Sequence, residues 1–161
     1  MIESPIVLEN SGAEIRNCTL SLETAEPLQF LDLTDLVAEI VEEAGIRHGL
    51  VNVQTRHTTT AIIINENEPL LLDDMKNTLE RLAPQAQPYR HNDFSIRTHN
   101  LEPDERQNGH SHCKAMFLRT SETLNIASGR IQLGPWQRIF LIELDGPRNR
   151  TVSVTTIGKV E

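Results

Sequence analysis

The sequence predicts one α/β domain of the α+β type, spanning residues 1–161, with a β-sheet or sandwich and two to three helices. Its length fits a single domain whose core needs no covalent staples. Short runs rich in β-branched residues recur between turn residues, as expected of strands. Two longer segments instead repeat apolar residues at helical spacing. Aromatic residues make up only 4% of the chain, so we expect a core built mainly from Leu, Ile and Val.

The clearest strand lies within His57–Glu68, which reads HTTTAIIINENE. Its Thr and Ile residues are β-branched, which favours an extended backbone. The apolar run Ala61–Ile64 is short, so we expect a strand that is buried on both faces. A strand of about eight residues spans roughly 26 Å, so its polar ends lie far apart. If His57 belongs to a site, its partners must come from other segments or from another subunit.

Further strands are predicted on both sides of this segment. Glu14–Glu23 alternates polar and apolar residues, which indicates a half-buried strand. Leu50–Thr55 directly precedes His57, and the two segments form either a tight hairpin or one long bent strand. Three more strands are predicted at Thr123–Ala127, Gln137–Leu144 and Arg150–Ile157, with Gly129 turning the chain into Arg130–Leu133. Gly134-Pro135 indicates a bend or a sheet edge, and Asp145-Gly146-Pro147 indicates a turn.

Apolar periodicity predicts two amphipathic helices. The first is capped by Asp32 or Thr34, ends at Gly45, and has an apolar face of Leu36, Val37, Ile40 and Val41. The second begins at Pro69, runs to Ala83, and has an apolar face of Leu72, Met75, Leu79 and Leu82. A third, shorter helix is expected between Asn108 and Leu118, with Asn108 as its cap.

Between the second and third helices, Pro84–Asn108 is irregular and polar. A loop of this length in a compact domain is either disordered or functional. It contains His91 and His99 and leads into His110 and His112, so four of the six histidines are close together in sequence. This clustering favours a functional loop.

Charge and composition restrict the class of protein. The net charge is −8, and no basic face of the kind that nucleic-acid binding requires is evident. The first residues lack the basic start of a signal peptide, and no apolar run is long enough to span a membrane. We therefore expect a soluble cytoplasmic protein that binds neither nucleic acid nor membrane. Cys18 and Cys113 are expected to be free thiols, with a disulfide between them as the alternative.

His57, His91 and His112 are the candidate metal ligands. Imidazole is the commonest ligand of transition metals, and three histidines with an open fourth position form a catalytic type of zinc site. On composition alone, ordinary polar or partly buried histidines are the better interpretation. His110 and His112 are two residues apart, so on a helix at most one of them faces the site. His48 is expected to lie on the surface.

Asn65 and Glu66, at the far end of the central strand, are candidates for contacts to a hydroxyl group, a heterocycle edge or Mg²⁺. The alternative is a turn, and the two interpretations are equally good. For the neighbouring Asn67 and Glu68, the better interpretation is a turn and the cap of the Pro69 helix.

Arg148 and Arg150 flank a turn, where guanidinium groups can clamp a phosphate with paired hydrogen bonds. For Arg138, pairing with surface acids is the better interpretation. The last candidates are Trp136, Gln137 and Glu143. Trp136 either fills the core or, beside the Gly-Pro bend, stacks on a flat ring.

Several motifs occur in an order that is specific in combination. They are His57-Thr-Thr-Thr-Ala-Ile-Ile-Ile-Asn65-Glu66, Tyr89-Arg90-His91, Asn108-Gly-His110-Ser-His112-Cys-Lys-Ala115, Gly129-Arg-Ile-Gln-Leu-Gly-Pro-Trp136-Gln137-Arg-Ile-Phe and Glu143-Leu-Asp-Gly-Pro-Arg148. Over nearly its whole length, the chain resembles the YjbQ-like family, also described as the secondary thiamine-phosphate synthase family. Pro135 stands where that family usually has Thr.

The resemblance implies a mostly antiparallel sheet in a YjbQ-like fold, assembled as a homotrimer. It also implies a pocket near a subunit boundary, lined by the positions that match His57, His91 and His112 and often holding a metal. The divalent metal is expected to be zinc-like at these histidines, or Mg²⁺ that accompanies a diphosphate.

By this resemblance, the expected activity joins hydroxymethylpyrimidine diphosphate to a thiazole phosphate and releases diphosphate. We expect His57, Asn65, Glu66 and His112 to be catalytic, and Trp136, Gln137, Arg148 and Arg150 to bind the small phosphorylated substrate. Three histidines suit a metal-dependent hydrolase better than this transfer, which has no obvious need for a zinc-like ligand set. The alternatives are therefore such a hydrolase, or a non-catalytic trimer that binds a metal or a phosphorylated metabolite.

Overall fold

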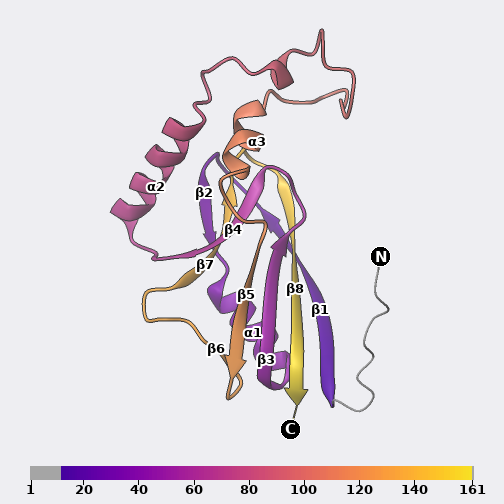
Figure 1. Ribbon diagram of the computed structural model, residues 1–161, viewed down its shortest axis with the longest axis vertical. Coiled ribbons are helices and arrows are strands. Elements are labelled where there is room, and N and C mark those ends of the chain that lie inside the picture. The colour runs from indigo at the N-terminus through magenta and orange to yellow at the C-terminus, as the bar shows by residue number, and fades with distance from the viewer. Residues whose placement is uncertain (1–11, 161) are drawn as a thin grey trace, which may run out of the picture.

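The computed structural model describes residues 12–160, which fold into two antiparallel sheets with helices packed around them (Figure 1). Within this range the larger sheet has the order β1-β8-β3-β5-β6 and the smaller sheet has the order β2-β7-β4. The larger sheet contains β1 (Ala13–Glu23), β3 (Ile46–Thr55), β5 (Ser121–Ala127), β6 (Arg130–Ile131) and β8 (Asn149–Val160). The smaller sheet contains β2 (Gln29–Asp32), β4 (Thr60–Asn65) and β7 (Arg138–Glu143). The remaining elements are α1 (Thr34–Ala44), α2 (Pro69–Leu82), η1 (Arg90–Asn92) and α3 (Gly109–Ala115).

This architecture confirms the predicted α+β fold with mostly antiparallel strands. The main core lies where α1 and the smaller sheet pack against the larger sheet, and it contains Val37, Val53, Leu141 and Val154. These residues are aliphatic, as the low aromatic content requires. Burial of such side chains contributes roughly 1.5–3 kcal/mol each, which makes this layer the main source of stability.

The smaller sheet is buried on both faces, as predicted for the strand that follows His57. Ile62 belongs to the main core, whereas the preceding Ala61 belongs to a second cluster with Leu79 of α2 and Ile142 of β7. Because successive side chains of a strand point to opposite faces, this alternation places apolar groups on both sides. β4 is therefore held between the main core and the layer formed by α2 and α3.

β3 and β4 are separate strands that do not pair as a hairpin, because they lie in different sheets. The chain crosses from the larger to the smaller sheet over residues 56–59. His57 consequently lies at the junction of the two sheets, next to the first residues of β8, where Thr151 contacts its ring.

The first predicted helix is confirmed, with two corrections. Its N-cap position is Leu33, although the carboxylate of Asp32 still accepts the N–H of Thr34 at 3.0 Å. Leu36 is 40% exposed and lies outside the buried face of the helix, which Val37, Val41 and Ala44 form. Gly45 ends the helix in the left-handed conformation, with φ of 69°, as predicted.

The second helix is confirmed as α2, with Pro69 in its first turn. The carboxylate of Glu68 accepts the N–H groups of Leu70 and Leu71, which confirms its predicted role as a cap. Leu79 is buried, but Leu82 is 51% exposed, so the expected apolar face is only partly covered.

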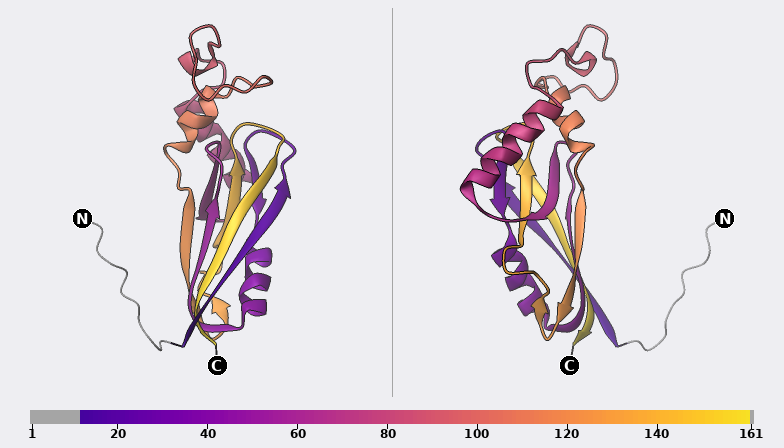
Figure 2. Two further views of the ribbon diagram at one scale, coloured as in Figure 1. Left: turned by 90° about the vertical axis from the view of Figure 1, so that its right-hand side faces the viewer. Right: turned by 60° about the vertical axis from the view of Figure 1, so that its left-hand side comes forward.

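The segment between α2 and α3 protrudes beyond the sheets (Figure 2). It contains η1, but is otherwise irregular in the described structure. One strand, β2, was not predicted, since its four residues carry no clear periodicity. Gly134-Pro135 lies in the turn between β6 and β7, as expected.

Both cysteines are free thiols, so the alternative of a disulfide between Cys18 and Cys113 is wrong. Among residues 12–160, no helix is long and apolar enough to cross a membrane.

Candidate functional site

A cavity of about 430 Å³ lies at the end of the sheets where β4 and β8 begin. Four parts of the chain supply its walls: the connection from β3 to β4, the segment around η1, the start of α3 and the start of β8. The lining residues are Arg56, His57, Thr58, Thr59, His91, Arg97, Asn100, Glu105, Asn108, His112, Arg148 and Arg150. The structure thus brings His57, His91 and His112 to one cavity, although they are distant in sequence.

His91 and His112 are in contact, with ring centroids 4.7 Å apart and the ring planes inclined by 64° in an edge-to-face arrangement. The pair forms because η1 packs directly on the first residue of α3. The N–H of Gly109 donates to the amide oxygen of Asn92 at 2.8 Å. A Cβ atom on Gly109 would lie 2.6 Å from the Cβ of Tyr89, so only glycine allows this close approach.

His57 is held by the main chain of β8. The N–H of Thr151 donates to its Nε2 at 2.8 Å, so Nε2 is an acceptor and the proton of the neutral ring resides on Nδ1. Burial lowers the pKa of His57, and the positive charge of Arg150 lowers it further. His57 is therefore a neutral imidazole at pH 7 that offers an N–H donor through Nδ1.

His112 is also neutral at pH 7. Burial lowers its pKa, and the neighbouring His91 and Arg97 act in the same direction against the smaller opposing effects of Asp145 and Glu105. A neutral imidazole can accept a proton or bind a metal, whereas an imidazolium can do neither. The state of His112 therefore suits a general base or a ligand.

The ligand set of three histidines stays a prediction, and the arrangement of the rings bears on it. In the part of the chain that the structure describes, no group of three His, Cys, Asp or Glu side chains is arranged to hold a metal. In addition, Nε2 of His57 is already bonded to the Thr151 N–H, which leaves only Nδ1 of that ring without a hydrogen-bond partner in the described structure. Only His91 and His112 are close enough to act as a pair of ligands.

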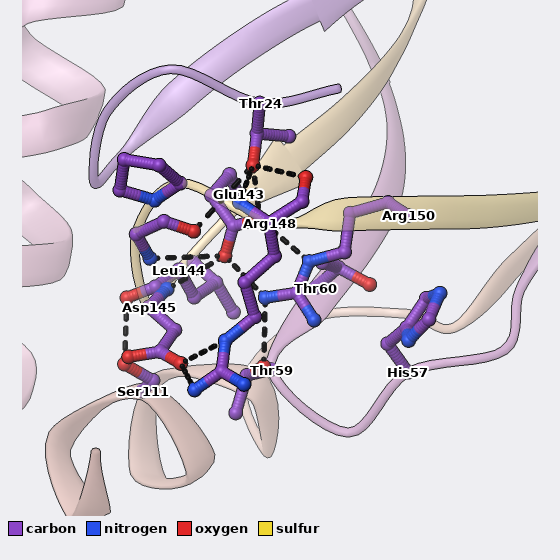
Figure 3. A network of polar contacts seen from close by, with 12 residues as sticks. Thr24, His57, Thr59, Thr60, Ser111, Glu143, Leu144, Asp145, Arg148 and Arg150 are labelled. Atoms are coloured by element: carbon purple, nitrogen blue, oxygen red, sulfur yellow. Dashed lines mark hydrogen bonds and ion pairs between the residues drawn. The ribbon is translucent and has the colours of Figure 1, made fainter. Parts of the chain in front are cut away.

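Glu143 is fully buried behind Arg150, which lines the cavity, and it holds the Arg150 guanidinium in place (Figure 3). Its carboxylate accepts hydrogen bonds from Nε and Nη2 of Arg150, both at 2.6 Å, and from the hydroxyl of Thr24 at 2.9 Å. The N–H groups of Asp145 and Gly146 also donate to it. Although burial raises the pKa of Glu143, the hydrogen bonds from Arg150 and Asp145 lower it overall. Glu143 is therefore an ionised anchor for the turn between β7 and β8.

This network also bears on the predicted phosphate clamp of Arg148 and Arg150. Arg150 is 4% exposed, and its guanidinium is occupied by Glu143 and by the Thr59 hydroxyl at 3.1 Å. Arg148 is bound through Nε and Nη2 to one carboxylate oxygen of Asp145, but its side chain remains 37% exposed. Arg148 can therefore still reach an anion, whereas Arg150 mainly supports the structure.

Arg97 and Arg56 also line the cavity, and again one is engaged within the fold while the other is accessible. Arg97 forms an ion pair with Glu105 at 3.1 Å and donates to the main-chain oxygens of His99 and Asn100, so it fixes the loop. Arg56 is exposed and has no ion pair or side-chain hydrogen bond with any other residue in 12–160. Sequence reasoning missed Arg56, although its position next to His57 was a usable signal.

The remaining candidates lie at the opposite end of the smaller sheet. Asn65 pairs with Arg138 in the register of β4 and β7, whereas Thr60 pairs with Glu143 at the cavity end. These ends are about 17 Å apart along the strand. Asn65, Glu66, Trp136 and Gln137 therefore do not line the histidine cavity of their own chain. Trp136 is 70% exposed, so it does not fill the core.

The other single-residue predictions agree with the structure. His110 is buried on the opposite side of α3 from the cavity, where Nε2 lies 3.1 Å from the Ser111 hydroxyl. His48 is exposed. Arg138 forms ion pairs with Asp32 and Asp35, as expected for a structural arginine.

Glu143 had been named as a candidate from the sequence without a specific role, and Asn108 had not been placed in the site. An acid within the apolar run Ile139–Leu144 was a signal for a buried ion pair, because a buried carboxylate needs a partner. Asn108 was interpreted only as a helix cap, yet its side chain makes no capping bond to α3 in the described structure.

The sequence matches the model of the family described as "UPF0047 protein YjbQ-like" over residues 18–159. A UPF0047 protein of Methanothermobacter thermautotrophicus is 40% identical over 146 residues, which cover 91% of this chain and 94% of the relative. A UPF0047 protein of Archaeoglobus fulgidus is also 40% identical, over 86% of this chain and 98% of the relative.

Solved structures give the same result. A protein of Sulfolobus solfataricus, described as YbjQ-like and of unknown function, superposes with a TM-score of 0.81 at 31% identity, covering 91% of this chain and 99% of the other. A hypothetical protein of Aeropyrum pernix gives a TM-score of 0.79 at 33% identity, with 89% and 99% covered. Sequence and structure agree that this chain belongs to the YjbQ-like UPF0047 family.

Proposed function

We propose that the cavity binds a small phosphorylated substrate and promotes the departure of its phosphate or diphosphate group. The observation that carries this proposal is the convergence of two accessible guanidinium groups, Arg56 and Arg148, with the neutral imidazoles of His57 and His112. Guanidinium groups bind phosphate oxygens, and imidazoles donate and accept protons near neutral pH. A volume of about 430 Å³ lies within the range of small-molecule sites.

In the finer form of the proposal, the protein is a transferase of the thiamine-phosphate synthase type. The carbon–oxygen bond of hydroxymethylpyrimidine diphosphate breaks, diphosphate leaves, and the thiazole nitrogen attacks the resulting carbocation. Arg56 and Arg148 neutralise the negative charge that develops on diphosphate, and Nδ1–H of His57 donates a hydrogen bond to it. Mg²⁺ that accompanies the diphosphate is the proposed cofactor for this reaction.

The first experiment measures thiamine phosphate formation from both substrates and Mg²⁺. We expect the wild type to form the product, and Arg56→Ala and His57→Ala to lower kcat/KM at least about 100-fold. His48→Ala is the matched control, because this residue is exposed and outside the cavity. Full activity of the two cavity variants would reject this site.

A metal-dependent hydrolase is the second candidate, favoured by the close pair of His91 and His112. The complete set of three histidines does not fit a metal in this arrangement, so the ligand pair would be His91 and His112. A bound divalent metal would supply a water of lowered pKa as the nucleophile. Hydrolysis of a panel of phosphoesters, stopped by chelator and by His112→Ala but not by His48→Ala, would support this candidate.

A non-catalytic binder of a metal or phosphorylated metabolite is the outcome if neither reaction occurs but the ligand still binds.

We also propose a cytoplasmic homotrimer. Exposed apolar side chains near α2 and α3, including Leu82, Met116 and Phe117, support burial against another subunit. Light scattering that gives the mass of a monomer would reject the trimer.

A further inference from the structure

A second cavity, here called the α1 cavity, lies at the other end of the molecule from the histidine cavity (Figure 1). One of its walls is α1, and the other is formed by the start of β3 and by the hairpin of β5 and β6. β3 begins at this cavity with Ile46 and ends at Thr55, directly before Arg56 of the histidine cavity. Its length is about 30 Å, so the two cavities are separate. The volume of the α1 cavity, about 630 Å³, is within the range of small-molecule sites.

Arg47 and Arg130 give the α1 cavity its positive charge. Both are exposed, and in the described part of the chain neither guanidinium has an ion pair or a hydrogen bond. Glu42, the one acid among the residues that line the cavity, pairs with neither of them. The chain has 23 acidic residues against 15 Lys and Arg, so acidic partners are abundant, and Arg138 has two of them. Two unpaired guanidinium groups in one cavity of such an acidic protein are available to an anion.

A β-bulge directs Arg47 to the cavity. In the pairing of β3 with β8, Ile46 lies opposite Val160 and His48 lies opposite Lys159, so Arg47 is an extra residue. The buried positions later in β3 are odd-numbered, and an uninterrupted strand would therefore turn Arg47 to the core and Ile46 to solvent. The bulge reverses this, since Ile46 is fully buried while Arg47 is exposed at the cavity.

The hairpin turn brings Arg130 to the same cavity. Ala127 pairs with Arg130, and between them Ser128 and Gly129 have φ of 53° and 75°. A turn with two left-handed residues favours Gly and Asn, so Ser128 holds a strained backbone of the kind that is found at ligand sites. The N–H of Gly129 donates to the main-chain oxygen of Arg47 at 3.0 Å. The turn and the bulge are thus bonded to each other, which places both arginines at one cavity.

Stabilisation of the C-terminus of α1 does not explain the two arginines. A cation in this position is favourable when it interacts with the last carbonyl groups of the helix. In this helix, Nη1 of Arg16 donates to the main-chain oxygen of Glu43 at 3.1 Å. The main-chain oxygen of Glu42 accepts the N–H of Gly45 at 3.0 Å. Other groups therefore bind these carbonyls, and the guanidinium groups of the cavity stay free.

We propose that the α1 cavity binds a phosphate monoester whose organic part is small and apolar. A phosphate monoester carries close to two negative charges near pH 7, which matches two guanidinium groups, whereas a carboxylate carries one. The hydroxyl of Ser128, which also lines the cavity, can donate a further hydrogen bond. Apolar side chains complete the lining and suit the organic part, namely those of Ala38, Val41, Ile131 and Leu133. The site does not depend on the reaction proposed for the histidine cavity.

Titration with phenyl phosphate, followed by two-dimensional amide NMR spectra, tests the proposal. In the wild type, we expect the amide signals of Arg47, Ser128 and Gly129 to shift. The affinity should be at least about tenfold higher than that for inorganic phosphate or for benzoate, because each of these lacks one half of the ligand. The amides of His57 and His112 report on the histidine cavity in the same spectra, so binding there is measured separately.

Variants of the two arginines identify the groups that bind the phosphate. Arg47→Gln and Arg130→Gln should each weaken binding of phenyl phosphate at the α1 cavity at least about tenfold. Both residues are exposed, so Tm should change by no more than about 2 °C. Arg119→Gln is the matched control, because Arg119 is exposed and lines neither cavity, and it should bind as the wild type.

Three results would overturn the proposal. They are amide shifts confined to the histidine cavity, unchanged affinity in both arginine variants, and benzoate or inorganic phosphate binding as tightly as phenyl phosphate. Because the two cavities are measured separately, failure of the reaction proposed for the histidine cavity would leave this site standing.

Discussion

Two polar regions lie beside the same cavity, which Arg150 lines on one side and Asn108 and His91 line on the other, and they differ in how completely their hydrogen bonds are satisfied. On one side, the carboxylate of Glu143 accepts bonds from Arg150, from Thr24 and from two main-chain N–H groups. On the other side, Asn108 and His91 each have a buried atom with no partner in the structure of residues 12–160. The polar groups of the first region are paired within the fold, whereas the second region keeps two unpaired buried atoms in the described structure.

This difference teaches that burial and polarity alone do not mark a binding residue. Arg150 attracts attention in the sequence as a possible phosphate ligand, but its bonds are already used within the fold. Asn108 attracts little attention, yet its bonds are free. The unsatisfied groups are therefore better candidates for ligand contact than the most strongly charged groups.

The largest effect is expected from breaking the satisfied region. Glu143→Ala leaves the Arg150 guanidinium buried without its anion, which should cost about 3–5 kcal/mol of unfolding free energy. Urea denaturation measures this loss. Replacing the pair together, by Glu143→Leu with Arg150→Met, should recover most of the stability. A loss for Glu143→Ala below about 1 kcal/mol would contradict the view of this region as a scaffold.

A smaller effect is expected where η1 meets α3. Gly109→Ala introduces a Cβ atom 2.6 Å from that of Tyr89, and the resulting shift should cost roughly 1–3 kcal/mol. Because the same contact holds His91 beside His112, ligand affinity should fall in parallel. Gly134→Ala is the control, since its Cβ would meet only the flexible side chain of Gln137, at 3.4 Å or more. Unchanged stability and affinity for Gly109→Ala would show that this contact is loose.

The pH dependence of stability follows from the buried histidines. The pKa values of His57, His110 and His112 are lowered, in each case first by burial, so the unfolded state binds protons more readily. The free energy of unfolding should have its full value above the ordinary histidine pKa of 6.5. It should decrease as the pH falls below 6.5 towards the pKa values of the folded state. His112→Gln should reduce this slope between pH 7 and 5. A stability that rises on acidification through this range would refute the assignment.

The smallest effect is expected at the far end of β4. Glu66→Gln and Asn65→Ala should change stability by no more than about 0.5 kcal/mol and leave phosphate binding unaltered. The reason is that neither residue reaches the histidine cavity of its own chain. A strong loss of ligand affinity in Glu66→Gln would instead require that this end of the sheet meets the cavity of another subunit.

Most of the fold could be predicted from local patterns. The β-branched run of β4, the turn at Gly146 and the glycine stop of α1 each follow from a property of the residues themselves. β2 was missed, because four residues carry too little periodicity. Whether the chain changes sheets after Thr55 could not be decided from the sequence, since this depends on packing between distant strands rather than on local sequence.

The candidate site was predictable only in part, and the reason is again nonlocal. The sequence selected His57, His91 and His112 by residue type, and the fold brings them to one cavity. It gave no sign that Thr151 would occupy one nitrogen of His57, or that Glu143 would engage Arg150. Such partnerships depend on strand register, which places residues from different parts of the chain in contact.

The bond that fixes His57 has a consequence for genetic surveys of this protein. Its donor is the peptide nitrogen of Thr151, which every amino acid except proline supplies equally. A change of side chain at position 151 removes the Thr151 hydroxyl, 3.1 Å from the same Nε2, but keeps the peptide N–H, so a scan of side chains would understate the importance of the position. Proline would expose it fully, by removing the N–H and freeing the imidazole to turn and exchange its tautomer.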